Sequence, residues 1–335
     1  MILHPGILAL LVGSVLVFTM MLYATFVAMR VAQKWDFESS SELQLTLERK
    51  TYLVSTVVHY ALGFEIVSIL LFIYTVDDLH VFFSGAMCAT GSLNANPVGW
   101  YALLVRLIVV GAAAFWIVLN HLDQKAPDYP LVRTKYTALF VITPLVGVSH
   151  YLQAAYFLGL EPEIITSCCG ALFSESGSGL AAGLTGLPVR PMMGVFYGTV
   201  TLFLAAAFWA PRPVGLPKYV LSGLSILLGP VALASIISFI SLYVYESPTH
   251  HCPFDMFQSR YYFVAYPLYA SVFGGVFFGA LPGLFQPLKR IASLTDEIGR
   301  MERKWIFRSV ILVAVFLILS SWPILFGSFT MRGYM

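Results

Sequence analysis

Several chemically reactive side chains stand next to one another in the stretch HHCPFDM, which begins at His250. Cys252 can act as a redox thiol when its thiolate is accessible and its pKa is lowered. The imidazolium forms of His250 and His251 would stabilise that thiolate. Asp255 stands where a Cys-x-x-Cys pair would have its second cysteine, so a resolving thiol has to come from another part of the chain.

Three other cysteines are available as partners for Cys252, namely Cys88, Cys168 and Cys169. Cys168 and Cys169 are adjacent, and a bond between them would close a small, strained ring. Strained and exposed disulfides have higher reduction potentials and are readily reduced. All four cysteines are therefore candidate catalytic residues for thiol–disulfide exchange.

The same stretch offers ligands for a soft metal ion. His250 and His251 supply imidazole nitrogens, Cys252 supplies a thiolate, and Met256 supplies a thioether. Soft sulfur ligands favour copper(I), and mixed imidazole and thiolate sets also suit zinc. The regular paired spacing of structural zinc sites is missing from the sequence. Metal handling, with copper as the first candidate, is therefore an alternative to redox chemistry.

The elements that carry these residues are predicted to be membrane-spanning helices. Of the 335 residues, 59% are hydrophobic and 11% are charged, whereas soluble domains carry about a quarter charged residues. Apolar stretches of about 20 residues are long enough to cross a bilayer as helices. The sequence predicts an all-α polytopic membrane protein that forms a single helical bundle over residues 1–335. Its eight predicted spans cover residues 5–28, 52–76, 99–119, 136–159, 192–210, 219–245, 261–283 and 306–327.

The distribution of Lys and Arg predicts the orientation of the spans, because cytoplasmic loops of membrane proteins are enriched in these residues. Of the 19 basic residues, 15 lie in or beside alternate loops: Arg30, Lys34, Arg49, Lys50, Lys125, Arg133, Lys135, Arg212, Lys218, Lys289, Arg290, Arg300, Arg303, Lys304 and Arg308. Both termini are then expected on the outer side, which is the periplasm of a bacterial inner membrane. No basic tract indicates nucleic-acid binding.

This topology places all four cysteines in outward-facing loops. The outer side of a bacterial inner membrane is oxidising, so disulfides form and persist there. Four cysteines allow three connectivities. One interpretation is that two disulfides fasten the outer loops of a membrane scaffold or permease subunit. The other is that the cysteines exchange electrons, for instance with a periplasmic thiol protein.

Three ionisable residues lie at similar depths within the predicted spans. Glu65 and His150 are roughly 20 Å from the cytoplasmic ends of their spans, and Arg106 is roughly 10 Å from the outer end of its span. In a hydrocarbon core about 30 Å thick these depths coincide. One expectation is a Glu65–Arg106 ion pair with His150 as a hydrogen-bond partner. The functional alternative is a quinone site, in which Arg106 holds a carbonyl while Glu65 and His150 supply protons. Three further polar residues could join the cluster: Tyr60, Tyr151 and Gln153.

Two predicted cytoplasmic loops, residues 35–50 and 284–305, carry helix-start signals. Ser39 begins a capping-box pattern before the stretch ELQLTLERK, and Ser293 begins a similar pattern before EIGRMERKW. We expect short interfacial helices that anchor the second and eighth spans, or docking surfaces for a cytoplasmic partner.

The stretch Cys252-Pro253-Phe254 is locally similar to the Cys-Pro-x-Cys motifs of thiol oxidoreductases. Cysteine-bearing outer loops above a helical bundle also resemble the plan of quinone-linked disulfide-forming membrane enzymes and of vitamin K epoxide reductases. Those families have fewer spans and an intact Cys-x-x-Cys pair. The resemblance implies a membrane thiol–disulfide redox protein coupled to a quinone. The alternatives are a copper or other soft-metal transporter or chaperone, and a scaffold or permease subunit with structural disulfides.

Overall fold

The computed structural model of the chain describes residues 2–35, 41–161, 165–166, 187–212 and 214–331. Every regular element in these residues is helical, and eight helical segments are long and apolar enough to cross a membrane. Many large apolar side chains on these helices are exposed, such as Val15, Leu104, Phe208 and Leu325. Such surfaces suit contact with lipid, so the predicted all-α, polytopic membrane architecture is confirmed.

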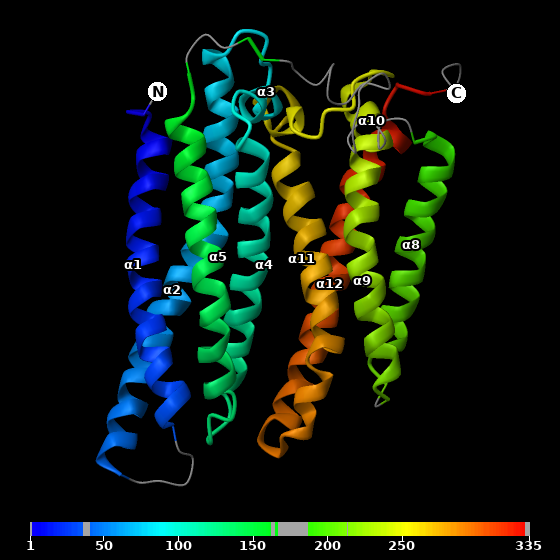
Figure 1. Cartoon of the computed structure of the whole chain (residues 1–335). Coiled ribbons are helices and arrows are strands. Elements are labelled where there is room, and N and C mark those ends of the chain that lie inside the picture. The colour runs from blue at the N-terminus through cyan, green and yellow to red at the C-terminus, as the bar shows by residue number, and fades with distance from the viewer. Residues whose placement is uncertain (1, 36–40, 162–164, 167–186, 213, 332–335) are drawn as a thin grey trace. The chain divides into compact units, whose positions relative to one another are not determined.

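The chain divides into two compact units, and the first comprises the described residues of 1–84 and 92–164. Its main helices are α1 (Pro5–Lys34), α2 (Glu42–Asp78), α4 (Gly99–Asp123) and α5 (Val132–Leu158), and the short η1 (Leu79–Phe82) follows α2. Each main helix packs against the next one in sequence, and α5 packs back against α1. These contacts close a four-helix bundle (Figure 1).

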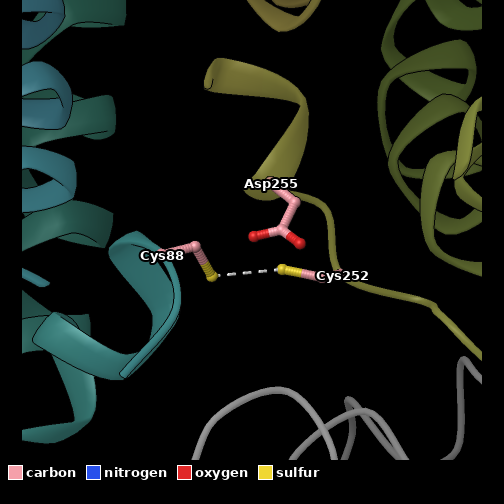
Figure 2. A group of neighbouring side chains, drawn as sticks. All are labelled: Cys88, Cys252 and Asp255. Atoms are coloured by element: carbon pink, nitrogen blue, oxygen red, sulfur yellow. Dashed lines mark hydrogen bonds between the residues drawn. The ribbon is translucent and has the colours of Figure 1, made fainter. Parts of the chain in front are cut away.

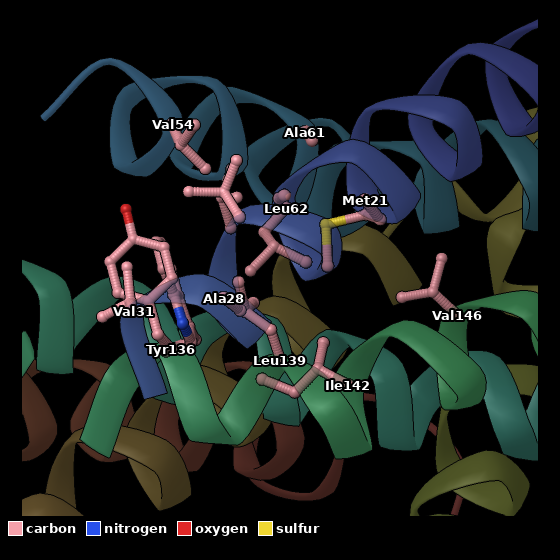
Figure 3. Packing of buried hydrophobic residues seen from close by; sticks show 14 of the residues in the cluster. Met21, Ala28, Val31, Val54, Ala61, Leu62, Tyr136, Leu139, Ile142 and Val146 are labelled. Atoms are coloured by element: carbon pink, nitrogen blue, oxygen red, sulfur yellow. The ribbon is translucent and has the colours of Figure 1, made fainter. Parts of the chain in front are cut away.

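The interior of this first unit is built from aliphatic side chains at helical spacing. Figure 3 shows Met21 and Ala28 of α1 lying near Leu62 of α2 and Leu139 of α5. All four belong to one buried cluster, which also takes in Trp116 of α4. Because lipid tails are as apolar as these side chains, close packing rather than removal from water holds the helices together.

The second unit comprises residues 85–91 and the described residues of 165–335. Its main helices are α8 (Val189–Trp209), α9 (Leu216–Ser235), α11 (Ala265–Leu284) and α12 (Ala292–Phe326). The sixth span continues from α9 through the π turn η2 (Ile236–Ile240) into α10 (Ser241–Tyr245). The short turns are η3 (Asp255–Phe257), η4 (Ser259–Tyr261) and η5 (Gln286–Arg290), and the short helix α3 (Ala89–Asn94) begins within residues 85–91. Within this unit α11 packs against both α9 and α12, and α8 packs against α9.

Small residues allow close approach of the helices in the second unit. A Cβ atom at Gly279 of α11 would lie 2.7 Å from Ser309 Oγ of α12 and would also collide with Ser225 of α9. One turn before Gly279 on α11, the carbonyl oxygen of Gly275 accepts a 2.6 Å hydrogen bond from Ser309 Oγ. Such small-residue contacts are typical of membrane helices that pack through van der Waals contact and interhelical hydrogen bonds.

Replacement of Gly279 by valine is expected to destabilise the second unit by about 1–3 kcal/mol, the usual cost of overpacking a filled interior. Gly198→Val is the matched control, because a Cβ atom at Gly198 of α8 meets no atom within 4 Å. Chemical unfolding of both purified variants in the same detergent provides the measurement. Equal losses of stability would show that helix propensity, not packing, sets the effect.

Two helices begin earlier than predicted and change the interpretation of the loops before them. Helix α2 starts at Glu42 and α12 starts at Ala292, so the charged stretches are the first turns of spanning helices and not separate short helices. Neither stretch contains a proline that would end a helix. The cap of α2 is Ser41, which accepts the N–H of Gln44 at 3.3 Å, whereas Ser39 lies outside the described residues. Helix α12 starts after Ile291 without a side-chain cap, so the cap predicted at Ser293 is not formed.

Helix α11 begins later than the predicted span, at Ala265. Tyr262 and Phe263 both have a φ of 55°, which is left-handed backbone and cannot continue a right-handed helix. The chain between α10 and α11 is therefore a structured loop, and this loop carries Cys252.

Candidate functional site

Two of the four cysteines meet at one end of the second unit. The Sγ atoms of Cys88 and Cys252 are 3.5 Å apart, and both side chains are fully buried (Figure 2). The two residues are 164 positions apart in the sequence. Since a disulfide bond is about 2.05 Å long, the sulfurs would have to approach by roughly 1.5 Å to form one. Cys168 and Cys169 lie outside the described residues.

Two tyrosines fix the backbone on both sides of the Cys252 side chain. The hydroxyl of Tyr245 donates to the carbonyl oxygen of Cys252 at 2.6 Å and accepts the N–H of Met256 at 3.1 Å. The hydroxyl of Tyr269, on α11, donates to the carbonyl oxygen of Pro253 at 3.1 Å. The loop is thus tied to the helices before and after it, which holds the thiol in place.

The segment that carries Cys88 is held against this loop by its backbone. The side-chain amide of Gln258 donates to the carbonyl oxygen of Met87 at 2.6 Å. Gly85 turns the chain with a φ of 86°, and a Cβ atom there would lie 2.6 Å from the carbonyl oxygen of Thr166. Only glycine fits this turn, which brings Cys88 to the second thiol.

Asp255 places a carboxylate beside the two sulfurs (Figure 2). One of its oxygens and both Sγ atoms lie within 4.8 Å of one another. Its Oδ2 atom is 2.8 Å from His250 Nε2 and accepts a 3.1 Å hydrogen bond from Arg260. Its Oδ1 atom is buried and has no hydrogen-bond partner among the described residues. A buried carboxylate oxygen without a partner is a candidate acceptor for a thiol proton.

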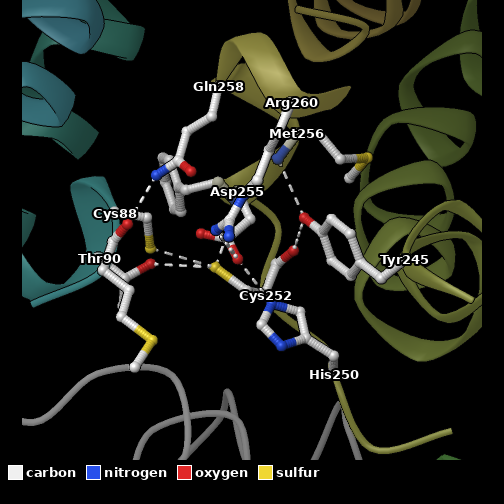
Figure 4. A network of polar contacts seen from close by, with 11 residues as sticks. Cys88, Thr90, Tyr245, His250, Cys252, Asp255, Met256, Gln258 and Arg260 are labelled. Carbon is white, nitrogen blue, oxygen red and sulfur yellow. Dashed lines mark hydrogen bonds and ion pairs between the residues drawn. The ribbon is translucent and has the colours of Figure 1, made fainter. Parts of the chain in front are cut away.

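The sulfur of Cys252 also receives two weak polar contacts. The backbone N–H of Phe254 donates to it at 3.4 Å, and Thr90 Oγ1 lies 3.6 Å away (Figure 4). A donor to the sulfur favours its charged form, so the N–H of Phe254 favours a thiolate at Cys252, whereas in the second contact either Thr90 or Cys252 can donate. Nearby, partial burial raises the pKa of Tyr261, against the opposing effect of Arg260, so its phenol stays neutral. Sequence reasoning did not identify Thr90, which has no motif around it.

The ligands proposed from the sequence for a soft metal are arranged differently from the expected group. His251 Nδ1 lies 2.8 Å from the carbonyl oxygen of Ile237 in the π turn. Met256 points away from the two sulfurs, and His250 lies next to the Asp255 carboxylate (Figure 4). Among the described residues, the group that could hold a metal ion is Cys88, Cys252 and Asp255. Tetrahedral zinc with bonds of about 2.3 Å would separate two sulfurs by about 3.8 Å, close to the observed spacing.

The three ionisable residues predicted to meet within the membrane do converge inside the first unit. Glu65, Arg106 and His150 are all buried, and His150 Nε2 lies 2.9 Å from Glu65 Oε1. The expected Glu65–Arg106 ion pair is not formed. Arg106 instead donates to Ser68 Oγ at 2.6 Å and to Gln153 Oε1. These two neutral acceptors take the guanidinium N–H groups that were expected to face Glu65.

Of the further residues expected in this cluster, only Gln153 belongs to it. Its side-chain amide donates to Ser14 Oγ of α1 at 2.9 Å, so the network joins four helices. Tyr60 and Tyr151 are 73% and 71% exposed, so they face away from the bundle interior. The missed member, Ser68, lies one helical turn after Glu65, a spacing that the sequence could have revealed.

Three polar atoms of this cluster are buried without a hydrogen-bond partner among the described residues. They are Glu65 Oε2, His150 Nδ1 and Arg106 Nε. Unsatisfied buried groups of this kind require an explanation, such as a catalytic role or a bound molecule. The pair formed by Glu65 and His150 can also share a proton, because one member is acidic and the other basic.

A comparison of the chain with protein-family models, curated proteins and solved structures finds no match. The fold and the site define a polytopic helical membrane protein with a buried pair of thiols beside a carboxylate. The function therefore has to be argued from the chemistry of this pair.

Proposed function

We propose that the protein is a membrane thiol–disulfide oxidoreductase whose redox pair is Cys88 and Cys252. The observation that carries this proposal is the 3.5 Å separation of the two buried sulfurs, which come from distant parts of the sequence. Oxidation of two thiols to one disulfide releases two electrons and two protons. A carboxylate beside the pair, with one oxygen unpartnered among the described residues, supports this chemistry because it can accept a proton.

In the proposed exchange, Asp255 takes the proton of Cys252, and the resulting thiolate attacks a substrate disulfide. A mixed disulfide forms, and one sulfur of the substrate leaves as a thiolate. Cys88 then attacks the Cys252 sulfur, and the second substrate sulfur leaves with the proton that Cys88 loses, so that the Cys88–Cys252 disulfide remains. One disulfide is thus reduced to a dithiol while one dithiol is oxidised, and the reverse reaction follows the same path.

Replacement of Asp255 by asparagine is expected to slow this exchange by about 10²-fold or more, the usual contribution of a positioned proton acceptor. The measurement is the rate of reaction of the full-length protein with a small disulfide, together with its thermal unfolding temperature. Asp296→Asn is the control, because Asp296 is exposed at the start of α12. A slow Asp255→Asn protein that remains folded supports the proton-transfer role. An unchanged rate would remove Asp255 from the mechanism.

When the exchange runs in reverse, a substrate dithiol reduces the Cys88–Cys252 disulfide, and the proposed acceptor of these electrons is a lipid-soluble quinone, with Glu65, Arg106 and His150 as the residues that would serve it. Reduction of a quinone to a quinol takes up two electrons and two protons. Glu65 Oε2 and His150 Nδ1 have no hydrogen-bond partner among the described residues, which supports a proton-donating role. Oxidation of the thiols by a short-chain quinone should be slower in Glu65→Gln, whereas oxidation by a soluble chemical oxidant should be unchanged. Equal effects on both oxidants would argue against quinone coupling at this cluster.

Metal handling is a second candidate, favoured by the grouping of Cys88, Cys252 and Asp255 within 4.8 Å. Two thiolates with a carboxylate suit zinc, and the sulfurs also suit copper(I). Metal analysis of the reduced protein separates this candidate from the redox proposal. One equivalent of metal that is lost in Cys88→Ser, with thiols that never become oxidised, would favour metal handling.

A further inference from the structure

A basic cavity lies at the end of the second unit opposite to the cysteine pair. Its volume is about 320 Å³. It is lined by Ala210, Pro211, Arg212, Lys218, Lys289, Gly299, Glu302, Arg303 and Ile306. Its lining residues come from the chain just after α8, the first turn of α9, the turn η5 and the first half of α12, so the cavity lies where the helices leave the apolar part of the bundle.

The charge balance of this cavity favours an anion. Four cationic side chains and one carboxylate line it, which leaves a net charge of three positive (4 − 1). Glu302 Oε2 lies 2.9 Å from Lys218 Nζ and 2.8 Å from Lys289 Nζ, and Glu302 Oε1 accepts a hydrogen bond from Gln286. A single buried carboxylate therefore holds two ammonium groups together but cannot neutralise all the surrounding charge.

The two arginines of the cavity, Arg212 and Arg303, are exposed at its rim and can reach a ligand from solvent. Neither Arg212 nor Arg303 forms a side-chain hydrogen bond or an ion pair within the described part of the chain. Guanidinium groups bind phosphate oxygens through two parallel hydrogen bonds, and an ammonium group adds a point charge. The Lys218 side chain is only 7% exposed, and a buried cation is costly unless anions surround it.

We propose that this cavity binds a phosphate-bearing anion, held by Arg212 and Arg303 together with Lys218 and Lys289. Basic pockets between membrane helices bind the headgroups of anionic phospholipids by this chemistry. A soluble phosphate would be bound by the same side chains. The site does not depend on the redox proposal, because none of its residues belongs to the cysteine loop or to the intramembrane cluster.

The test compares two double variants of the full-length protein in detergent. Arg212→Gln with Arg303→Gln removes the two arginines and leaves the Glu302 ion pairs in place. Arg290→Gln with Lys304→Gln removes the same charge from exposed residues that do not line the cavity. Native mass spectrometry measures retained cardiolipin against phosphatidylcholine, and thermal unfolding measures stabilisation by inorganic phosphate.

We expect the wild-type protein to retain cardiolipin, or to be stabilised by inorganic phosphate, about tenfold better than the variant that lacks both arginines. A response to cardiolipin assigns the site to a lipid, and a response to phosphate alone assigns it to a soluble ligand. The proposal is overturned if neither probe distinguishes the wild type from the arginine variant. It is also overturned if the control variant loses binding to the same extent.

Gly299 allows a second test without removal of any cation. Gly299 lines the cavity, and a Cβ atom at this position meets no atom within 4 Å, so a new side chain starts in open space at the site. Gly299→Glu should abolish binding of either probe, because it adds a negative charge to the site. Gly299→Gln adds the same volume without the charge and should weaken binding less. Equal binding by both variants and the wild type would contradict an anion site here.

Discussion

Replacement of Cys252 by serine is expected to abolish thiol–disulfide exchange, because a hydroxyl group cannot form a disulfide. Replacement of Cys88 is expected to stop the reaction at a different point. We propose Cys252 as the attacking thiol, because the backbone N–H of Phe254 donates to its sulfur at 3.4 Å, and Cys88 as the thiol that resolves the intermediate. Cys88→Ser should therefore accumulate a mixed disulfide with a small aromatic disulfide substrate. Intact mass spectrometry detects the added mass, and absorbance of the leaving thiol gives the rate.

The matched control for both variants replaces Cys168 and Cys169 by serine. This protein keeps only Cys88 and Cys252, so it should exchange at the wild-type rate. If this control loses exchange while Cys252→Ser keeps it, the adjacent cysteines, and not Cys88 and Cys252, carry the reaction. Because both active sulfurs are fully buried, small disulfides should also react faster than bulky ones.

Replacement of His150 by leucine is expected to destabilise the first unit by about 3–5 kcal/mol, the usual cost of leaving a buried charge without its partner. The reason is that Glu65, which is 1% exposed, would lose its 2.9 Å contact inside the membrane. His59→Leu is the control, since His59 on α2 is only partly buried and forms no ion pair among the described residues. Chemical unfolding in detergent micelles measures both.

A double variant makes this prediction more specific. Glu65→Leu combined with His150→Leu removes both members of the pair, so much of the lost stability should return. A double variant that is less stable than His150→Leu would show that Glu65 does not depend on His150. In that case the two side chains would be neighbours without energetic coupling, and they could not share a proton.

The architecture and the depth of the polar cluster could be predicted from the sequence for the same reason. Bilayer thickness fixes the length of a span, and helical rise fixes how deep a residue lies, whatever its contacts. This is why Glu65, Arg106 and His150 were expected together. Depth does not say which side of a helix faces which neighbour. The hydrogen bonds of Arg106 with Ser68 and Gln153 therefore had to come from the structure.

The pairing of the cysteines could not be predicted either. The predicted topology places all four cysteines in outward-facing loops, but four cysteines allow three connectivities. The choice of Cys88 depends on contacts that have no sequence signature, namely the turn at Gly85 and the bond from Gln258 to Met87. Helix boundaries were missed for a different reason. Hydropathy falls where charged residues begin, whereas the two helices include these residues and start only at Glu42 and Ala292.

The central claim is that Cys88 and Cys252 form one reversible redox pair. Differential isotopic alkylation of membranes, followed by peptide mapping, measures the oxidised fraction of each cysteine under quinone-replete and quinone-depleted conditions. The claim predicts that the two fractions change together and that the oxidised peptides are linked to each other. It is contradicted if the pair remains in one state under both conditions, or if Cys88 and Cys252 are linked to other partners.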